Sequence, residues 1–165
     1  MPLRPPVSEK DHIQGNASAP LELVQYGDYQ CPFCWKAYPI VKRLQESLGD
    51  HLKFIFRNFP LTKIHPQAKT AAIASEAAAL QNKYWEMHDL LYERHLNLTD
   101  EAIITYATEL DLDIFKFKSD MEKQELADKV EAEFLSGLRS GVNATPTFFI
   151  NEEKYTGDWE GDHLL

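Results

Sequence analysis

The seven residues 30–36, QCPFCWK, constrain the fold and chemistry of this chain more than any other stretch. They contain both of its cysteines, Cys31 and Cys34, separated by a proline and a phenylalanine. The preceding LELVQY, at 21–26, alternates and is rich in strand-forming residues. Pro32 suits the first turn of a helix, where its missing N–H costs nothing. The two cysteines are therefore predicted to lie between the end of a strand and the start of a helix.

The remaining periodicity predicts one α/β domain over residues 1–165. Residues 1–20 are rich in proline and are predicted to form an extended arm. Apolar spacing predicts a helix from Pro32 to Leu48, a strand over 51–59, and helices over 66–81 and 83–94. A further helix is predicted to be capped by Thr99, and one or two more cover 113–139, where Leu126, Val130, Phe134 and Leu138 lie four residues apart. Two strands are predicted at 147–151 and 153–157. Because a strand–helix–strand order usually gives two parallel strands, we expect a βαβ unit, then a helical block, then a hairpin.

Composition excludes some classes of function. The 165 residues carry a net charge of −9, which opposes binding to nucleic acids or anionic membranes. No apolar run approaches the ~18 residues of a membrane span, and the N-terminus has no apolar signal region. As written, the protein is expected in the cytoplasm; if a leader has been removed, a periplasmic or other extracytoplasmic location is expected instead. We expect a monomer.

The cysteine pair has three possible roles. As a structural disulfide it would stabilise the fold by only about 2 kcal/mol, because the loop it closes is so short. A zinc site needs four ligands, and the chain has no further cysteine and no suitably spaced histidines. His88 and His95 could share a helix face, but packing beside Trp85 and Tyr92 is the simpler account. No metal ligand is predicted.

The third role, disulfide exchange, follows from the position of the pair. At a helix N-terminus the free backbone N–H groups and the helix dipole stabilise a thiolate. The thiolate is the attacking species, so Cys31 is the predicted nucleophile. Cys34, one turn later, can attack the resulting mixed disulfide. This chemistry needs no metal or organic cofactor beyond a redox-active Cys31–Cys34 disulfide.

Two prolines elsewhere favour the same role. Pro39 lies inside the predicted helix, where it should interrupt the hydrogen bond to the Trp35 carbonyl and kink the helix. NATPTFFI, at 143–150, places Thr145 and Pro146 directly before a strand. A proline there could merely end a loop, whereas a cis proline would be a tight-turn feature able to meet Cys31 across the fold.

The chain resembles the DsbA-like disulfide oxidoreductases of the thioredoxin fold. The resemblance rests on GNASAPLELVQYGDYQCPFC, the proline five residues after the second cysteine, FRNFPL, the helical block and GVNATPTFFIN, which span about residues 12–158. It implies a thioredoxin-like fold, with a βαβ–ββα core and an all-helical insertion, 66–140, between the second and third core strands. The expected partners are protein or peptide thiols and disulfides, and an unidentified redox partner.

The resemblance also implies residue roles. Cys31 is the attacking thiol and Cys34 the resolving one, and the loop of Thr145 and Pro146 is the cis-proline loop beside which an extended substrate segment pairs. The expected supporting residues are Gln25, Pro32, Phe33 and Trp35.

Two departures from the family pattern stand out. Gln25 occupies a position where these folds often carry a buried, proton-relaying acid, and a glutamine cannot titrate. The only acids nearby, Glu22 and Asp28, are expected at the surface. The sequence stops at EGDHLL, where the last core helix should begin, so either that helix is stunted or the sequence is truncated there.

Two alternatives to a DsbA-like function remain. The first is a cytoplasmic disulfide reductase or glutathione-linked exchanger, which runs the same chemistry in the opposite direction. The second is a chaperone-like binding module with vestigial cysteines, although the intact CPFC sequence argues against it.

Overall fold

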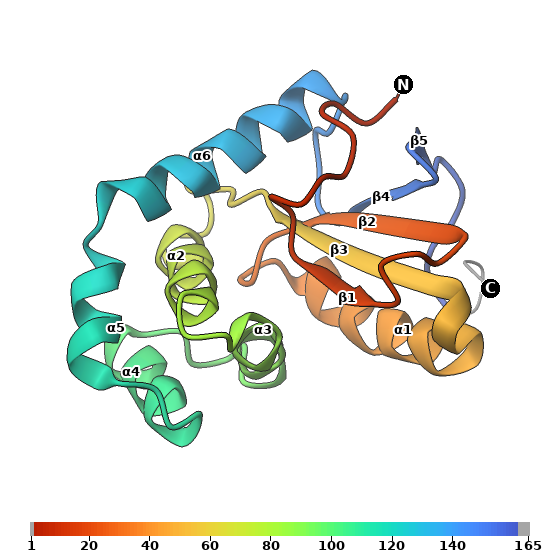
Figure 1. Cartoon of the computed structure of the whole chain (residues 1–165). Helices are drawn as coiled ribbons and strands as arrows, with labels where there is room; N and C mark the ends of the chain where they lie inside the picture. Colours follow the sequence, from red (N-terminus) through yellow and green to blue (C-terminus); the bar gives the residue numbers. More distant parts are fainter. Residues whose placement is uncertain (1, 162–165) are drawn as a thin grey trace. The chain divides into compact units, whose positions relative to one another are not determined.

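The computed structural model describes residues 2–161, which divide into two compact units (Figure 1). The sheet unit comprises residues 2–27, 31–59 and 133–161, and the helical unit comprises 28–30 and 60–132. Both cysteines belong to the sheet unit, whereas the three residues before Cys31 belong to the helical unit. Each unit is described by itself below.

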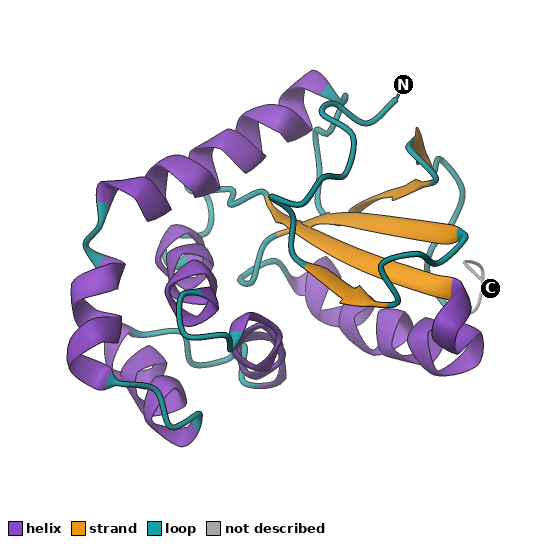
Figure 2. Cartoon of the chain, viewed as in Figure 1, coloured by secondary structure: helices purple, strands orange, loops and turns teal. Residues whose placement is uncertain are grey.

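The sheet unit is built on a five-stranded mixed sheet (Figure 2). Its strands are β1 (Ile13–Gly15), β2 (Leu21–Gly27), β3 (Leu52–Asn58), β4 (Thr147–Ile150) and β5 (Glu153–Lys154), in the order β1-β3-β2-β4-β5. The central pair, β2 and β3, is parallel, and every other pair is antiparallel. The α/β class, the βαβ unit and the terminal hairpin were all predicted, although β5 is shorter than expected.

Helix α1 (Pro32–Leu48) connects the two parallel strands and begins where the sequence predicts. Cys31 is its N-cap, with extended backbone angles of φ −83° and ψ 122°. Pro39 lies inside the helix, which continues past it to Gly49. Gly49 has φ 49°, a left-handed conformation that favours glycine, and it ends the helix. A short 3₁₀ turn, η1 (Gly49–His51), leads into β3.

The last part of α6 (Gln124–Arg139) completes the core of the sheet unit. Phe134 stacks on Phe59, with ring centroids 4.4 Å apart, and the Ser136 hydroxyl lies 2.7 Å from the Tyr26 hydroxyl. A Cβ at Gly137 would come within 2.6 Å of the Phe59 ring, so this close approach requires glycine. Leu138 continues the four-residue spacing of Leu126, Val130 and Phe134, but it is 50% exposed, because the buried stripe drifts around the helix to Ser136 and Ser140.

The N-terminal arm is bound to the sheet unit along its length. The backbone of Leu3 donates to the Glu152 carbonyl over 2.8 Å, and the backbone of Arg4 donates to the Ser140 hydroxyl over 2.8 Å. Leu3 is buried. The arm ends in β1, which pairs with β3 and was not predicted. A three-residue strand that ends in a glycine carries too little alternation to be recognised in sequence.

The helical unit contains α2 (Ala68–Ala79), α3 (Tyr84–Glu93), α4 (Asp100–Glu109) and α5 (Ile114–Met121), and α6 begins in it. The Thr99 hydroxyl accepts from the Ala102 backbone over 3.2 Å, which is the predicted cap of α4. His88 is buried among the rings of Tyr29, Tyr84, Trp85 and Tyr92, as the packing interpretation requires.

After β5, the described residues contain no further helix. The predicted start of a last core helix at EGDHLL lies mostly outside the described residues. None of the helices within 2–161 has both the length and the apolar content that crossing a membrane requires.

Candidate active site

Cys31 and Cys34 lie one helical turn apart at the start of α1, and both are in the reduced, thiol form. The Cys31 carbonyl accepts from the backbone N–H groups of Cys34, over 3.0 Å, and Trp35, over 3.1 Å. Cys31 is 4% exposed and Cys34 is fully buried, so Cys31 is the one with residual access to solvent. This is the order of access that an attacking thiol and a resolving thiol need.

The surroundings of Cys31 lower its pKa from about 9 to about 5. The main cause is a hydrogen bond from the Cys34 side chain, which outweighs the opposing effect of burial. The Thr145 side chain and the backbone N–H groups of Cys34 and Phe33 lower the pKa further. These donors favour the thiolate, so Cys31 is ionised at neutral pH.

Thr145 and Pro146 lie beside Cys31, as the cis-proline hypothesis requires. The Thr145–Pro146 peptide bond is cis. When protonated, the Cys31 thiol donates to the Thr145 carbonyl over 3.6 Å. The Thr145 hydroxyl is buried, and among residues 2–161 no group forms a hydrogen bond with it while Cys31 is a thiol. It is therefore available to donate to the Cys31 thiolate.

Replacing Thr145 with valine is expected to raise the pKa of Cys31 by about one unit. Valine preserves the shape but removes one donor to the thiolate, and one unit corresponds to about 1.4 kcal/mol, within the range of a hydrogen bond to a charged group. The pH dependence of the thiolate's ultraviolet absorbance measures the shift. Thr145→Ser keeps the hydroxyl and serves as the control; an unchanged midpoint in Thr145→Val would contradict the contribution of this hydroxyl.

The other predicted supporting residues occupy different environments. Pro32 is the first helical residue, and Trp35 is half-buried in the same turn. Phe33 is 53% exposed beside the cysteines, with the Lys36 ammonium 5.5 Å from its ring centroid. Gln25 is buried in β2, and its side-chain N–H₂ group lacks a hydrogen-bond partner among the described residues.

Asp28 was expected at the surface but is 1% exposed. Its carboxylate is satisfied by three donors of the helical unit, which is why its burial is tolerated. The sequence signal was its place in GDY, three residues before Cys31, but neither spacing nor periodicity distinguishes an acid held by donors from one in water.

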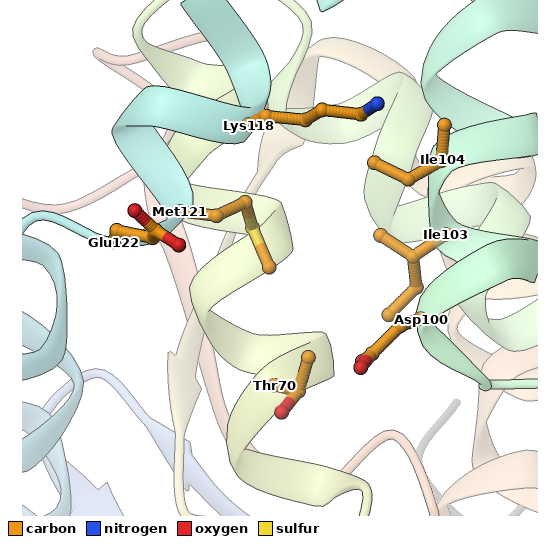
Figure 3. A pocket seen from close by; sticks show the side chains of 7 residues that line it. All are labelled: Thr70, Asp100, Ile103, Ile104, Lys118, Met121 and Glu122. Carbon is orange, nitrogen blue, oxygen red and sulfur yellow. The ribbon is translucent and has the colours of Figure 1, made fainter.

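Two further observations do not involve the cysteine pair. Within residues 2–161, no group of three or more His, Cys, Asp or Glu side chains is arranged to hold a metal ion. A pocket of about 380 Å³ lies inside the helical unit (Figure 3). Its lining combines apolar side chains with charges of both signs, from Thr70, Asp100, Ile103, Ile104, Lys118, Met121 and Glu122.

Fold and site together define a thioredoxin-fold protein with a cysteine pair at a helix N-terminus, beside a cis-proline loop. The sequence pattern of a thioredoxin family, Thioredoxin_4, matches residues 7–164. The chain therefore belongs to this thioredoxin family.

Solved structures with the same fold include several thiol–disulfide proteins. A thioredoxin-like oxidoreductase from Silicibacter pomeroyi DSS-3 has a TM-score of 0.84 and 25% identity, covering 95% of this chain and 89% of that one. Oxidised BdbD from Bacillus subtilis has a TM-score of 0.82 and 24% sequence identity, and the match covers 96% of this chain and 90% of BdbD. The thiol-disulfide exchange protein alpha-DsbA2 from Wolbachia pipientis has a TM-score of 0.80 and 20% sequence identity, and the match covers 92% of this chain and 83% of alpha-DsbA2.

Curated relatives are much longer proteins. The chain is 38% identical to the Na(+)/H(+) antiporter NhaA 1 of Mycolicibacterium vanbaalenii over 99% of its own length but 27% of the antiporter's. It is also 38% identical to the Na(+)/H(+) antiporter NhaA of Herminiimonas arsenicoxydans, covering 97% of this chain and 25% of that protein. The chain thus spans about a quarter of these relatives, and the antiporter name describes those longer proteins.

Proposed function

We propose that this chain is a disulfide oxidant of protein or peptide thiols, working through the CPFC pair. In the oxidised protein, a substrate thiolate attacks the Cys31 sulfur, the Cys31–Cys34 bond breaks, and Cys34 leaves as a thiolate. A second substrate thiolate then attacks the substrate sulfur of this mixed disulfide, and Cys31 leaves. The substrate loses two electrons and gains a disulfide, while the protein gains two electrons and is reoxidised by a partner disulfide. No other cofactor takes part.

The observation that carries this proposal is the placement of the cysteine pair, with Cys31 at the N-cap of α1 beside Thr145 and Cys34 one turn later, which lowers the pKa of Cys31. A thiol with a pKa of about 5 is a good leaving group, which speeds the second step. It also stabilises the reduced protein, because the folded state holds a thiolate that the unfolded state would protonate. A disulfide whose reduced form is stabilised in this way tends to oxidise other thiols.

The direction of electron flow can be tested by the stability of the two redox forms. The folded-state pKa of Cys31 lies below its unfolded value, so the resulting stability is complete above about pH 9 and is lost as pH falls through 5. At pH 7 it amounts to about 3 kcal/mol in favour of the reduced form. The disulfide opposes this with about 2 kcal/mol, by restricting the unfolded chain.

We therefore expect the stability order to reverse with pH. Reduced protein should melt at the higher temperature at pH 7, oxidised protein should do so at pH 4, and the two curves should cross at about pH 6.5. Melting curves of both forms at several pH values check this. Greater stability of the oxidised form at pH 7 would favour the reductase alternative. Failure of either form to exchange disulfides with a model peptide would favour the binding module.

A further inference from the structure

The three residues before Cys31, Asp28–Gln30, are each held by the helical unit, to which they belong. We call them the anchor segment. The Tyr29 hydroxyl lies 2.8 Å from Nδ1 of His88, and its ring packs against Tyr92 with centroids 4.7 Å apart. The side chains of all three residues therefore have partners in α3 or in the loop before α2. This segment is held more firmly than a strand-to-helix connection requires.

Gln30 and Gln67 hold each other reciprocally. Oε1 of Gln30 accepts from the Gln67 backbone N–H over 2.8 Å, and Nε2 of Gln30 donates to Oε1 of Gln67 over 3.3 Å. Gln67 is the N-cap of α2, and its own side chain makes no capping hydrogen bond. Gln30 therefore satisfies a backbone donor at the start of α2 while tying the residue next to Cys31 to that helix.

Asp28 is the centre of the anchor segment. One carboxylate oxygen, Oδ1, accepts from the Gln30 backbone N–H over 2.7 Å, which fixes the turn immediately before Cys31. The other, Oδ2, accepts from the Leu61 backbone N–H over 2.9 Å and from Nδ1–H of His65 over 2.7 Å. The Asp28 side chain has no exposure, whereas that of His65 is 16% exposed. The turn is thus covalently connected to Cys31, which follows it in the sequence, and hydrogen-bonded to the loop before α2.

We propose that Asp28 and His65 are positioning residues for Cys31, which set how well its sulfur meets the donors that stabilise the thiolate. The proposal deepens the function proposed above and rests on it. The Asp28 carboxylate fixes the Gln30 N–H and with it the orientation of the Tyr29–Gln30 peptide plane, one residue before Cys31. Cys31 is the N-cap, and its sulfur must lie within reach of the Phe33 and Cys34 backbone N–H groups for its pKa to fall. A turn that rotates freely would place the sulfur at these donors for only part of the time.

The test acts on His65, because Asp28→Ala would leave two backbone donors without their acceptor and endanger the fold. His65→Ala removes one of the two attachments of Oδ2 from a partly exposed site. His65→Asn is the conservative variant, since the asparagine N–H₂ group can occupy the place of Nδ1–H without carrying a charge. Lys63→Ala, an exposed position in the same loop, is the matched control.

The readout is the pKa of Cys31 in each full-length reduced protein, from the pH dependence of its alkylation, with melting temperatures measured in parallel. We expect His65→Ala to raise this pKa by about one unit, so that the thiolate fraction at pH 5 falls about fivefold. His65→Asn should restore the parent value, and Lys63→Ala should not change it. A purely structural role would lower the melting temperature of His65→Ala but leave its pKa in place, which would overturn the proposal.

Two other results would also overturn it. If His65→Asn were as impaired as His65→Ala, the charge of His65 rather than its hydrogen bond would control the thiolate. If Lys63→Ala shifted the pKa equally, the effect would not be specific to the anchor segment. The measurement uses no substrate, so it is separate from the proposed function: a parent pKa near 9 would reject that function, whereas a low parent pKa unaffected by His65→Ala would reject only the positioning role.

Discussion

Replacing Cys34 with serine is expected to trap this protein on its substrates as mixed disulfides. The Cys31 thiolate of this variant can still attack a substrate disulfide, but the serine hydroxyl cannot displace the substrate from the Cys31 sulfur. Catalytic turnover should therefore be lost, and one substrate molecule should remain bound to each chain. Incubation with an oxidised model peptide, followed by mass measurement without reductant, detects this adduct.

The reverse substitution separates the roles of the two thiols. Cys31→Ser should form no adduct and show no exchange, because Cys34 is fully buried inside α1 and the nucleophile is gone. The variant with both substitutions gives the background of the assay. Equal trapping by the two single variants would show that either cysteine can attack, and the assigned roles would be wrong.

Asp11→Ala is expected to cause a large loss of stability, because it breaks a buried ion pair. Asp11 binds Arg57 through both carboxylate oxygens, over 2.8 Å from Nε and 3.0 Å from Nη2, and the two side chains are only 8% and 3% exposed. Burial disfavours the charged guanidinium, but its hydrogen bonds to Asp11 more than compensate and raise the pKa of Arg57 above its usual value. Arg57 would therefore stay charged without its counter-ion, at a cost of about 3–5 kcal/mol in the free energy of unfolding.

Glu109→Ala is the matched control for that experiment. Glu109 also binds an arginine through both oxygens, but its side chain and that of Arg94 are each 44% exposed. When such an exposed ion pair is broken, water solvates the remaining charge, so little stability is lost. The midpoint of denaturant unfolding of Glu109→Ala should therefore be close to that of the parent protein. If the two variants lost equal stability, the Asp11–Arg57 pair would not act as a buried ion pair. The remaining bond from Arg57 to the Tyr26 hydroxyl, over 2.9 Å, would then be sufficient.

Most of the fold could be predicted from local sequence, because its main helices and strands have strong apolar periodicity or residues that mark where they start and stop. Pro32 and Thr99 each mark the start of a helix, and Gly49 marks the end of one, by preferences that do not depend on tertiary structure. The strand β1 and the exposure of Leu138 were missed because both depend on which surfaces meet in the folded chain. The same holds for the arm, whose composition predicts an extended chain but not what it binds.

The candidate site could be predicted in part. Its two cysteines and its proline loop are encoded by short motifs with a chemical reason for each residue. The burial of Asp28 could not be predicted, because its three donors include a backbone N–H and a histidine more than thirty residues away, at Leu61 and His65. A hydrogen bond over such a separation leaves no periodic signal along the chain, although it decides whether a carboxylate is buried or solvated.

The bound N-terminal arm has a consequence for self-association. The outer strands of the sheet are β1, which pairs with β3 over Ile13–Gly15, and β5, where Pro2 forms a bridge with Glu153. The same short stretch of chain thus shields both rims of the sheet, and neither rim offers a long row of free N–H and C=O groups to another molecule. Loss of residues 2–15 would uncover the seven-residue β3 and turn it into a template for pairing between molecules. We therefore expect the arm to protect the folded protein from aggregation, a role separate from the chemistry of its cysteines.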